Sequence, residues 1–583
     1  KNLEYRGYDS AGIAVVEDGK VNLYKAKGKI SNLEDKIQSL NIKSETGIGH
    51  TRWATHGEPS ETNAHPHQVG AVTLVHNGII ENYNELKFDL LENGVKFKSE
   101  TDTEVACAYI NEKYKTEKNK IKCISRATED FRGSYAFGII FDDEKDAIYA
   151  TRKDSPLVIG VCEGSANFIA SDISAILDFT NKYILLEYGE YAKVTADSIE
   201  IYNKELAKVE KEIKTATWSA SEYKKNGYDH FMLKEIHEQP KVMKDIFKRF
   251  IESNTYGQDF DLSKYTNIHI VACGSAMHAG LVGKYLFETY ASIPVSVDVA
   301  SEYRYKNQLI TPTTLVILVS QSGETADTLA ALRIAKEKGA DTLAIVNAVG
   351  STIAREAAVC IYTYAGPEIA VATTKGYTSQ VAIFATLALD LAKEKGFISK
   401  ELEENIYSDF NNIESLMEQT IERIDEYKSI AEKIYKKDNL FFIGRGIDSA
   451  VSMEGSLKLK EISYMHSEAY AAGELKHGTI SLIEEGTPVI AIATNNDLYE
   501  KTISNVKETK ARGSYTIFIS TDNFNNANTS DFANITLILP KTTEFVQTLI
   551  TVCALQLISY EVAYLRGCDI DKPKNLAKSV TVE

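Results

Sequence analysis

The chain has 583 residues, of which 44% are hydrophobic and 25% charged, and its formal net charge is −17 at pH 7. This length allows about three to five domains, and the composition is that of an ordinary globular protein. The negative charge argues against nucleic acid or an anionic membrane as the main partner, and no apolar run is expected to approach the length of a membrane span. Seven scattered cysteines without metal-type spacing, and no recognisable signal peptide, favour a reducing cytoplasm.

The first third of the chain, residues 1–215, alternates short strand patterns with turns that carry Gly, Asp and Asn. The predicted strands include 12–16, 71–75, 135–141 and 191–194, and the predicted helices include 82–93 and 103–114. This pattern favours an α+β domain of stacked sheets with helices outside them.

Polar residues of this part gather in three short loops, at 49–56, 76–78 and 99–103. In the first loop, Arg52 could bind a carboxylate through two parallel hydrogen bonds, and in the third loop Asp102 could hold an ammonium group. The two side chains together would recognise the head group of an amino acid.

The Asn77-Gly78 pair, which follows an apolar strand, has two interpretations. It could be a hairpin turn, for which Asn-Gly is a common sequence. Alternatively, the side-chain amide of Asn77 and the backbone N–H of Gly78 could stabilise an oxyanion.

Five of the eleven histidines lie in the same region: His50, His56, His65, His67 and His76. No metal site is predicted from them, because no cysteine is near and their spacing is not that of metal ligands. Structural or hydrogen-bonding roles are expected instead.

Four segments, 4–12, 50–57, 76–82 and 99–104, together resemble the class II glutamine amidotransferase domains. The resemblance implies the N-terminal-nucleophile hydrolase fold, a four-layer αββα sandwich. It also implies roles for particular side chains: glutamine binding by Arg52, Thr55, His56 and Asp102, an oxyanion hole of Asn77 and Gly78, an ammonia gate at Trp53, and a position near the nucleophile for Arg6.

The sequence departs from that family in its nucleophile, which is a cysteine at the mature N-terminus. The chain starts at Lys1, and its first cysteine, Cys107, lies in a predicted helix. The missing strand and part of a helix would amount to about twenty residues. As written, this chain is expected to bind glutamine poorly and not to hydrolyse it. We expect the native protein to carry the cysteine; an inactive homologue with a natural deletion is the alternative.

The connecting region carries Trp218, for which burial in a domain interface is expected. The segment 230–240 has a helical pattern up to Pro240, where a new helix is expected to begin, since proline is favoured in a first helical turn. This is the first predicted domain boundary.

The rest of the chain contains an internal repeat. Segments 267–276 and 439–448 both run from an apolar strand through Gly into a helix, and second strands follow at 314–319 and 487–494. The alternation of strands and helices predicts a doubly wound parallel sheet in each copy. Ligands of such sheets bind beyond the carboxyl ends of the strands.

The strand 314–319 is followed by Ser-Gln-Ser-Gly-Glu-Thr at 320–325 and then by a predicted helix at 326–338. The unpaired N–H groups and the dipole of a helix N-terminus attract anions, so the sequence predicts a phosphate site. A turn and N-cap cluster without a ligand is the alternative.

Both copies resemble sugar-isomerase domains, which bind phosphosugars. The resemblance implies that the first copy binds the phosphosugar through Ser275, Ser320, Gln321, Ser322, Thr325 and the backbone near Val371. The second copy has no such turn, and its counterpart is 493–497. We therefore expect one sugar site, with catalytic residues supplied by the second copy.

Lys458 and Glu461 are three residues apart and would share one helix face. They could form a surface salt bridge, or they could move a proton between adjacent sugar carbons. The resemblance implies that Glu461 is the base, that Lys458 assists it, and that His477 acts in ring opening at a neighbouring subunit. It also implies that Lys578 forms a Schiff base with the sugar ketone, and burial is expected to lower the pKa of this lysine.

From Glu4 to its last residue the chain resembles the glucosamine-6-phosphate synthase family. The implied reaction converts L-glutamine and fructose 6-phosphate into glucosamine 6-phosphate and glutamate, with ammonia passed inside the protein. No metal or other cofactor is implied, and a homodimer is expected. The predicted division is a glutaminase domain at 1–215, a linker at 216–242, sugar-isomerase domains at 243–415 and 416–565, and a catalytic tail at 566–583.

Two other functions are compatible with parts of the sequence. A phosphosugar-binding regulator would use the repeat for sensing, but it would not need Lys458, Glu461 or Lys578. A deglycase acting on fructosamine phosphates would use the sugar site, but it would not carry the glutaminase domain.

Overall fold

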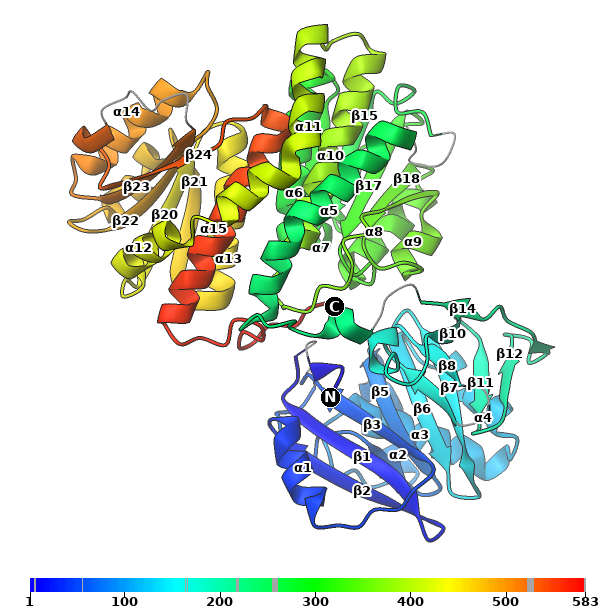
Figure 1. The fold of residues 1–583 in the computed structure, drawn as a ribbon. Helices are drawn as coiled ribbons and strands as arrows, with labels where there is room; N and C mark the ends of the chain where they lie inside the picture. Colours follow the sequence, from blue (N-terminus) through cyan, green and yellow to red (C-terminus); the bar gives the residue numbers. More distant parts are fainter. Residues whose placement is uncertain are drawn as a thin grey trace. The chain divides into compact units, whose positions relative to one another are not determined.

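The computed structural model describes residues 1–583 apart from 5–6, 55, 163, 165, 217–219, 254–259, 522–528 and 581–583, and apart from the side chains of 220–221 and 252–253. The chain divides into two compact units, Lys1–Lys224 and Lys225–Lys578, and Ser579 and Val580 group with the first unit. The elements of each unit can be followed by their labels in Figure 1. The expected burial of Trp218 lies outside the described residues.

The first unit contains three antiparallel sheets. The largest has the order β13 (Lys208–Val209), β12 (Ile199–Tyr202), β11 (Tyr191–Val194), β7 (Glu144–Lys153), β6 (Gly133–Phe141), β5 (Val72–Ile80) and β4 (His67–Val69). A three-stranded sheet has the order β2 (Lys20–Lys27), β1 (Ser10–Glu17) and β3 (Gly47–Arg52). A four-stranded sheet has the order β14 (Lys214–Thr215), β10 (Lys182–Leu185), β8 (Val158–Cys162) and β9 (Ala166–Ala170). The helices are α1 (Ile30–Gln38), α2 (Tyr83–Glu92), α3 (Asp102–Thr116) and α4 (Lys120–Glu129), with short 3-10 turns η2 (Ile173–Ala175) and η3 (Ala220–Tyr223).

The two smaller sheets pack on one face of the seven-stranded sheet. Ala14 and Ile48 of the three-stranded sheet share an apolar core with Val75 and Ile140, and Ile159 of the four-stranded sheet belongs to a second such core. Helices α3 and α4 cover the opposite face of the seven-stranded sheet, and α1 covers the outside of the three-stranded sheet. This layering confirms the predicted αββα sandwich.

The second unit contains two five-stranded sheets in which every neighbouring pair of strands is parallel. The first has the order β16 (Val295–Val299), β15 (Asn267–Ala272), β17 (Thr314–Ser320), β18 (Asp341–Val346) and β19 (Val359–Tyr362). The second has the order β21 (His466–Ala471), β20 (Asn439–Gly444), β22 (Pro488–Ala493), β23 (Tyr515–Thr521) and β24 (Ile535–Leu539). Both sheets therefore have the same strand order, which confirms the predicted duplication and the doubly wound parallel sheets.

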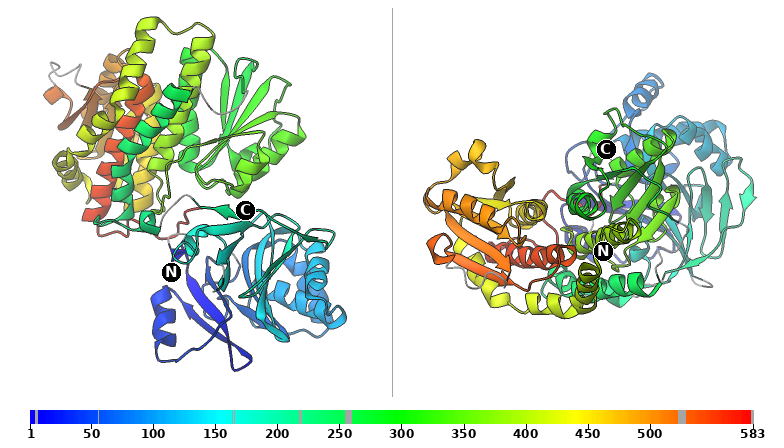
Figure 2. Two further views of the ribbon diagram at one scale, coloured as in Figure 1. Left: turned by 45° about the vertical axis from the view of Figure 1, so that its right-hand side comes forward. Right: turned by 90° about the horizontal axis from the view of Figure 1, so that it is seen from above.

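Helices between the two sheets form the shared core of this unit, as Figure 2 shows. They are α5 (Phe231–Ser253), α6 (Gly274–Tyr290), α10 (Lys375–Glu394), α11 (Lys400–Ile421), α12 (Ile424–Ile434), α13 (Ile447–Ser463) and α15 (Glu544–Leu565). The outer face of the first sheet is covered by α7 (Ala300–Tyr303), α8 (Ala326–Glu337) and α9 (Thr352–Glu356), and that of the second by α14 (Tyr499–Lys510). Because both faces are covered, strands such as β17 are buried at every position.

Helix α15 contradicts the expectation that no apolar run is long enough to span a membrane. Among the described residues it is the one helix that is long and apolar enough to do so. However, 89% of its most apolar 18-residue window is buried inside the protein. The helix is apolar on all sides because it lies in the shared core, where every face meets other apolar side chains.

Helix α5 runs through Pro240 without interruption, so the prediction that a new helix begins there is wrong. Proline has no N–H, and the carbonyl of Ile236, one turn earlier, therefore loses its usual partner. The side-chain amide of Gln239 donates to that carbonyl, with 3.2 Å between Nε2 and O. A side chain thus supplies the hydrogen bond that the proline cannot make.

Candidate active site

The turn at 320–325, here called the cradle, connects β17 to α8 at the carboxyl end of the first parallel sheet. Ser320 Oγ lies 2.9 Å from Thr325 Oγ1 and accepts the N–H of Gly323 at 3.0 Å. Gly323 has a φ of 63°, and a Cβ at this position would lie 2.0 Å from Ser351 Oγ. Only glycine fits this turn without strain or displacement of its neighbour.

The cradle opens onto the N-terminus of α8. Thr325 is the N-cap residue of that helix but makes no side-chain capping hydrogen bond, and the N–H groups of a first helical turn have no partner within the helix. The carbonyl of Gln321 accepts the N–H groups of Asn347 and Ala348 at 3.1 and 3.2 Å. Ser322 Oγ accepts a backbone N–H within the turn at 3.2 Å. The cradle is therefore fixed in shape and has the polarity that an anion requires.

Ser275, in the first turn of α6, connects the two copies of the repeat. It is buried, and its hydroxyl donates to Glu454 Oε1 at 2.8 Å. Glu454 belongs to α13 in the second copy, and its other oxygen lies 2.8 Å from His278 Nδ1. A residue predicted to bind the phosphosugar is thus held by a carboxylate from the other copy.

Glu454, Lys458 and Glu461 form a stripe along α13. Lys458 is fully buried, and its Nζ lies 2.6 Å from Glu461 Oε2 and 3.4 Å from Glu454 Oε1. Burial opposes the charge on Lys458, but the two carboxylates outweigh it and raise the pKa of this lysine above its usual value. The pair is therefore not a surface salt bridge, although the Glu461 side chain remains 21% exposed.

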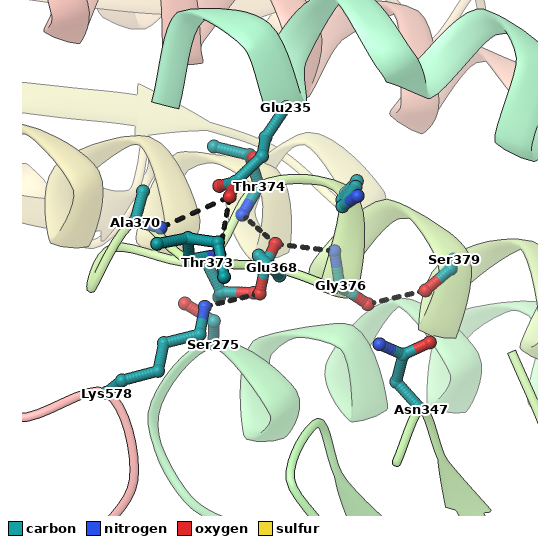
Figure 3. Close-up of polar contacts among 12 residues, drawn as sticks. Glu235, Ser275, Asn347, Glu368, Ala370, Thr373, Thr374, Gly376, Ser379 and Lys578 are labelled. Atoms are coloured by element: carbon teal, nitrogen blue, oxygen red, sulfur yellow. Dashed lines mark hydrogen bonds and ion pairs between the residues drawn. The ribbon is translucent and has the colours of Figure 1, made fainter. Parts of the chain in front are cut away.

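The C-terminal tail meets the same region through Lys578, whose Nζ lies 2.5 Å from Glu368 Oε2 (Figure 3). The tail is anchored by Asp571, whose carbonyl accepts the N–H of Val371 at 3.0 Å. The N–H of Val371 is thus already paired, so a sugar beside this residue would meet its carbonyl.

His477 ends the 3-10 turn η4 (Leu475–His477), which is followed by η5 (Thr479–Leu482), and its side chain is exposed. Neither ion pair of Lys458 involves it. Its contribution to a neighbouring subunit stays a prediction.

The corresponding position in the second copy is filled by the protein itself. Asp448, in the first turn of α13, is buried and accepts the N–H groups of Thr494 and Asn495 at 2.8 and 3.2 Å. The hydroxyl of Thr494 also donates to it at 2.5 Å. Burial raises the pKa of Asp448. The carboxyl group of Asp448 thus uses the N–H and hydroxyl donors that follow β22 (Pro488–Ala493). An external anion would need these same donors.

In the first unit, Arg52 ends β3 and is 4% exposed. Its Nη2 donates to the carbonyls of His56 and Gly57, the latter at 3.1 Å, whereas Nη1 is buried without a hydrogen-bond partner. Burial lowers the pKa of Arg52. A buried donor without a partner is costly, and the carboxylate of an amino acid would satisfy it.

Asn77 and Gly78 lie inside β5, paired with Ala136 and Tyr135 of β6. The hairpin-turn interpretation is therefore wrong. Gly78 has a φ of 134°, and a Cβ there would lie 2.1 Å from the carbonyl oxygen of Ser134. This close approach requires glycine at position 78.

Asp102 begins α3 and is buried beside the end of the same strand. Its Oδ2 accepts the N–H of Ile80 at 2.9 Å and lies 3.8 Å from His76 Nδ1. Its charge also acts on Arg52. Asp102 is thus near enough for its charge to act on Arg52, the other group predicted to recognise an amino acid.

Of the remaining residues predicted to belong to the glutamine site, the structure describes Trp53 and His56. Trp53 is 38% exposed, and the ring of His56 packs edge-on against Tyr83 with 4.9 Å between centroids. Thr55 and Arg6 lie outside the described residues.

Four of the histidines gather in one cluster. The ring of His65 lies 4.5 Å from that of His50 and 5.3 Å from that of His67, centroid to centroid, and it stacks on His76 at 6.5 Å. Burial lowers the pKa of all four. Uncharged rings in such an interior fit the packing role expected for them.

Three buried carboxyl groups were missed by the sequence reading. Glu454 could have been found, because it lies four residues before Lys458 and so shares its helix face. Glu368 and Glu235 could not, since the partner of Glu368 is Lys578, 210 positions away, and Glu235 pairs with a distant loop.

Comparisons with known proteins agree with this arrangement. A family model described as SIS domain matches residues 261–390 and 433–566, and one described as Glutamine amidotransferase domain matches residues 50–178. The fold and its matches define the class: a glutamine amidotransferase domain followed by two SIS domains.

Relatives and a solved structure identify the family. The glutamine–fructose-6-phosphate aminotransferase (isomerizing) of Clostridium tetani is 50% identical over 593 residues, covering 100% of this chain and 96% of the relative. That of Aquifex aeolicus is 44% identical over 586 residues, with the same two coverages. The C-terminal domain of glucosamine-fructose-6-phosphate aminotransferase from Francisella tularensis covers 60% of this chain and 100% of its own, at 37% identity and a TM-score of 0.58. The chain belongs to the glutamine–fructose-6-phosphate aminotransferase (isomerizing) family, and these relatives are enzymes.

Proposed function

We propose that this protein transfers the amide nitrogen of L-glutamine to fructose 6-phosphate and isomerises the product to glucosamine 6-phosphate. The observation that carries the proposal is the match to aminotransferases of this name over the whole chain. The buried Lys458–Glu461 pair supports it, because a binding module has no need to bury a charged lysine beside a carboxylate.

Glutamine binds in the first unit. The unpaired Nη1 of Arg52 takes the α-carboxylate of glutamine, and Asp102 takes its α-ammonium group. Asn77 and the N–H of Gly78 stabilise the oxyanion that forms when the side-chain amide is attacked. With the N-terminal cysteine that the family resemblance implies as nucleophile, attack on the amide carbon releases ammonia and leaves a thioester, and water then cleaves the thioester to release glutamate.

The sugar binds in the second unit, with its phosphate on Ser320, Gln321, Ser322 and Thr325 and with Ser275 beside them. Lys578 gives one proton to solvent and, as the free amine, attacks the ketone at C2, and loss of water gives an imine. Ammonia then displaces the lysine. Glu461 takes the proton from C1 of the new imine and returns it to C2, which yields the amino aldose. Lys458, whose Nζ lies 2.6 Å from Glu461 Oε2, assists these transfers.

Ammonia passes between the two sites inside the protein, past Trp53. In water at neutral pH it would be mostly ammonium, which is not a nucleophile. The protein acts in the cytoplasm as a homodimer, in which His477 serves the ring-opening step of the neighbouring subunit. No metal or other cofactor is needed for these steps.

Glu461→Gln tests the assignment of the base. It should lower the rate of glucosamine 6-phosphate formation by about 10²–10⁴-fold, with fructose 6-phosphate affinity unchanged within about threefold. The measurement is product formation from fructose 6-phosphate with ammonia, which does not depend on glutamine hydrolysis. If Glu461→Gln keeps the wild-type rate with ammonia, the assignment of the base is wrong.

A further inference from the structure

The carboxylate that meets Lys578 is held unusually firmly. Glu368 is 4% exposed and accepts four hydrogen bonds. Its Oε1 takes the N–H groups of Thr374 and Gly376 at 2.8 and 2.9 Å, and its Oε2 takes the hydroxyl of Thr373 at 2.7 Å and the ammonium of Lys578 at 2.5 Å (Figure 3). Burial favours the neutral carboxyl, but Lys578 and the other donors lower the pKa of Glu368 to about 2. The group therefore stays a carboxylate in a single orientation.

Glu368 also lies at the edge of the cradle. A Cβ on Gly376 would be 2.8 Å from Glu368 Oε2 and 3.1 Å from Gln321 Cγ, so one glycine touches both residues. The charge of Glu368 further acts on Lys458. Lys578 is consequently held by a carboxylate that borders the predicted phosphate site.

The rest of the tail is fixed to the same elements. The carboxylate of Asp571 accepts the N–H groups of Phe231 and Met232 at the start of α5, at 2.9 and 3.0 Å, and its carbonyl accepts the N–H of Val371. Helix α5 also carries Glu235, whose Oε1 accepts the N–H groups that follow Glu368. The loop, the helix and the tail form one hydrogen-bonded assembly around Lys578.

We propose that Glu368 is a positioning residue for the imine-forming lysine: it holds the Lys578 side chain, which is only 6% exposed, beside the cradle until a ketose phosphate arrives. The inference rests on the proposed function, since it gives Glu368 a role only if Lys578 forms the imine. Without the carboxylate, the long lysine side chain would sample many rotamers, and fewer encounters with the ketone would be productive.

The test measures imine formation directly. The full chain is mixed with fructose 6-phosphate and cyanoborohydride, and mass spectrometry follows the hexose phosphate that becomes attached to Lys578. Glu368→Gln should slow trapping by about tenfold or more, the usual effect of losing one charge-assisted hydrogen bond. Glu368→Asp, which keeps the charge, should recover part of the rate.

Two controls separate positioning from a general structural effect. Glucitol 6-phosphate has no carbonyl and cannot form an imine, so its affinity should be unchanged in Glu368→Gln if the cradle is intact. Glu238→Gln removes another carboxylate–lysine pair between α5 and α10, 2.6 Å from Lys375, and should leave trapping at the wild-type rate.

The outcomes distinguish the inference from the proposed function. Wild-type protein that is not trapped, or is trapped on another lysine, would contradict the imine at Lys578 itself. Normal wild-type trapping with an equal rate in Glu368→Gln would overturn the positioning role alone. An equal loss of glucitol 6-phosphate affinity and of trapping would also overturn it, because Glu368 would then only support the fold.

Discussion

Ser275 and Glu454 belong to different copies of the sugar-isomerase repeat, yet the hydroxyl of the first donates to the carboxylate of the second across 2.8 Å. Glu454 also faces Lys458, at 3.4 Å. One buried carboxylate thus joins a predicted sugar-binding residue to the predicted proton-transfer pair. The site is built from both copies of the repeat.

Removing the charge of Glu454 should therefore destabilise the second unit. Glu454→Gln leaves a fully buried Lys458 with one fewer counter-charge, and breaking such a pair costs about 3 kcal/mol or more. Burial acts against the carboxylate, but Lys458 and the hydrogen bonds lower the pKa of Glu454. Urea unfolding of the full chain, followed by circular dichroism, gives the free energy of unfolding.

Ser275→Ala is the matched control, because it removes only a neutral donor to the same carboxylate. It should cost about 1 kcal/mol. Equal stability of Glu454→Gln and the wild type would show that the carboxylate does not support the buried lysine.

Because Nη1 of Arg52 is buried without a hydrogen-bond partner, we expect Arg52 to be important for glutamine binding. Arg52→Lys keeps the charge but loses the planar two-pronged geometry, and the affinity for glutamine should fall by about tenfold or more. Calorimetric titration of the full chain with glutamine measures it. Arg132→Lys is the control, since the side chain of Arg132 is 62% exposed and pairs only with an exposed Glu85. Unchanged glutamine affinity in Arg52→Lys would remove Arg52 from the site.

Variants at Gly323 and Gly339 separate two effects of an added Cβ, which are backbone strain at a positive φ and a steric clash with a neighbouring atom. Gly323→Ala introduces a Cβ next to Ser351 Oγ at a positive φ, and it should weaken fructose 6-phosphate binding by about tenfold or more. Gly339, just past the same helix, also has a positive φ but has no atom within 4 Å of its added Cβ. Gly339→Ala should cost stability and leave sugar binding unchanged. A similar loss of binding in both variants would mean that the cradle is not the binding site.

Glu235 predicts a pH dependence of stability. Burial, together with the charge of Glu368, raises the pKa of Glu235 to about 8, whereas its ordinary value is 4.5. Between these values the folded chain keeps a proton that the unfolded chain has lost. Stability must therefore fall as pH rises from about 4.5 to about 8, by about 1.4 kcal/mol per pH unit.

Glu235→Gln removes this titration, so its stability relative to the wild type should increase over the same pH range. Thermal unfolding of both proteins from pH 5 to pH 8.5 provides the comparison. Lys578 and Lys375 favour the charged form of Glu235 and so lower its pKa. Removing either lysine should raise the pKa of Glu235 further, and such variants serve as controls. Parallel pH profiles for the wild type and Glu235→Gln would show that Glu235 is ionised in the folded protein throughout.

Local patterns in the sequence predicted most of the fold. The apolar run before Ser320 became β17, and the repeat of strand, Gly and helix became two sheets of identical order, because burial on both faces leaves a strand continuously apolar. The prediction that a new helix begins at Pro240 was wrong because it also used only the local sequence. Proline usually interrupts a helix, and the compensating amide of Gln239 depends on a side-chain orientation that no periodicity reveals.

The site was predictable to the extent that its residues are neighbours in sequence. The cradle and the Lys458–Glu461 pair follow from spacing, whereas the Asn77-Gly78 pair was ambiguous because hairpin turns and strand interiors can both contain Asn-Gly. The contact of Lys578 with Glu368 joins residues 210 positions apart. Such a pair becomes visible only when the tail has folded back on the first sheet.

The carboxyl group of Asp448 gives a reason why the second copy of the repeat should not bind a phosphosugar. Asp448 occupies the backbone donors at the end of the second parallel sheet, so these donors are not available to a phosphate group. Each chain should therefore bind one equivalent of hexose phosphate at saturation. This difference between the two copies agrees with the predicted roles, in which the first copy binds the phosphosugar and the second copy supplies Lys458 and Glu461.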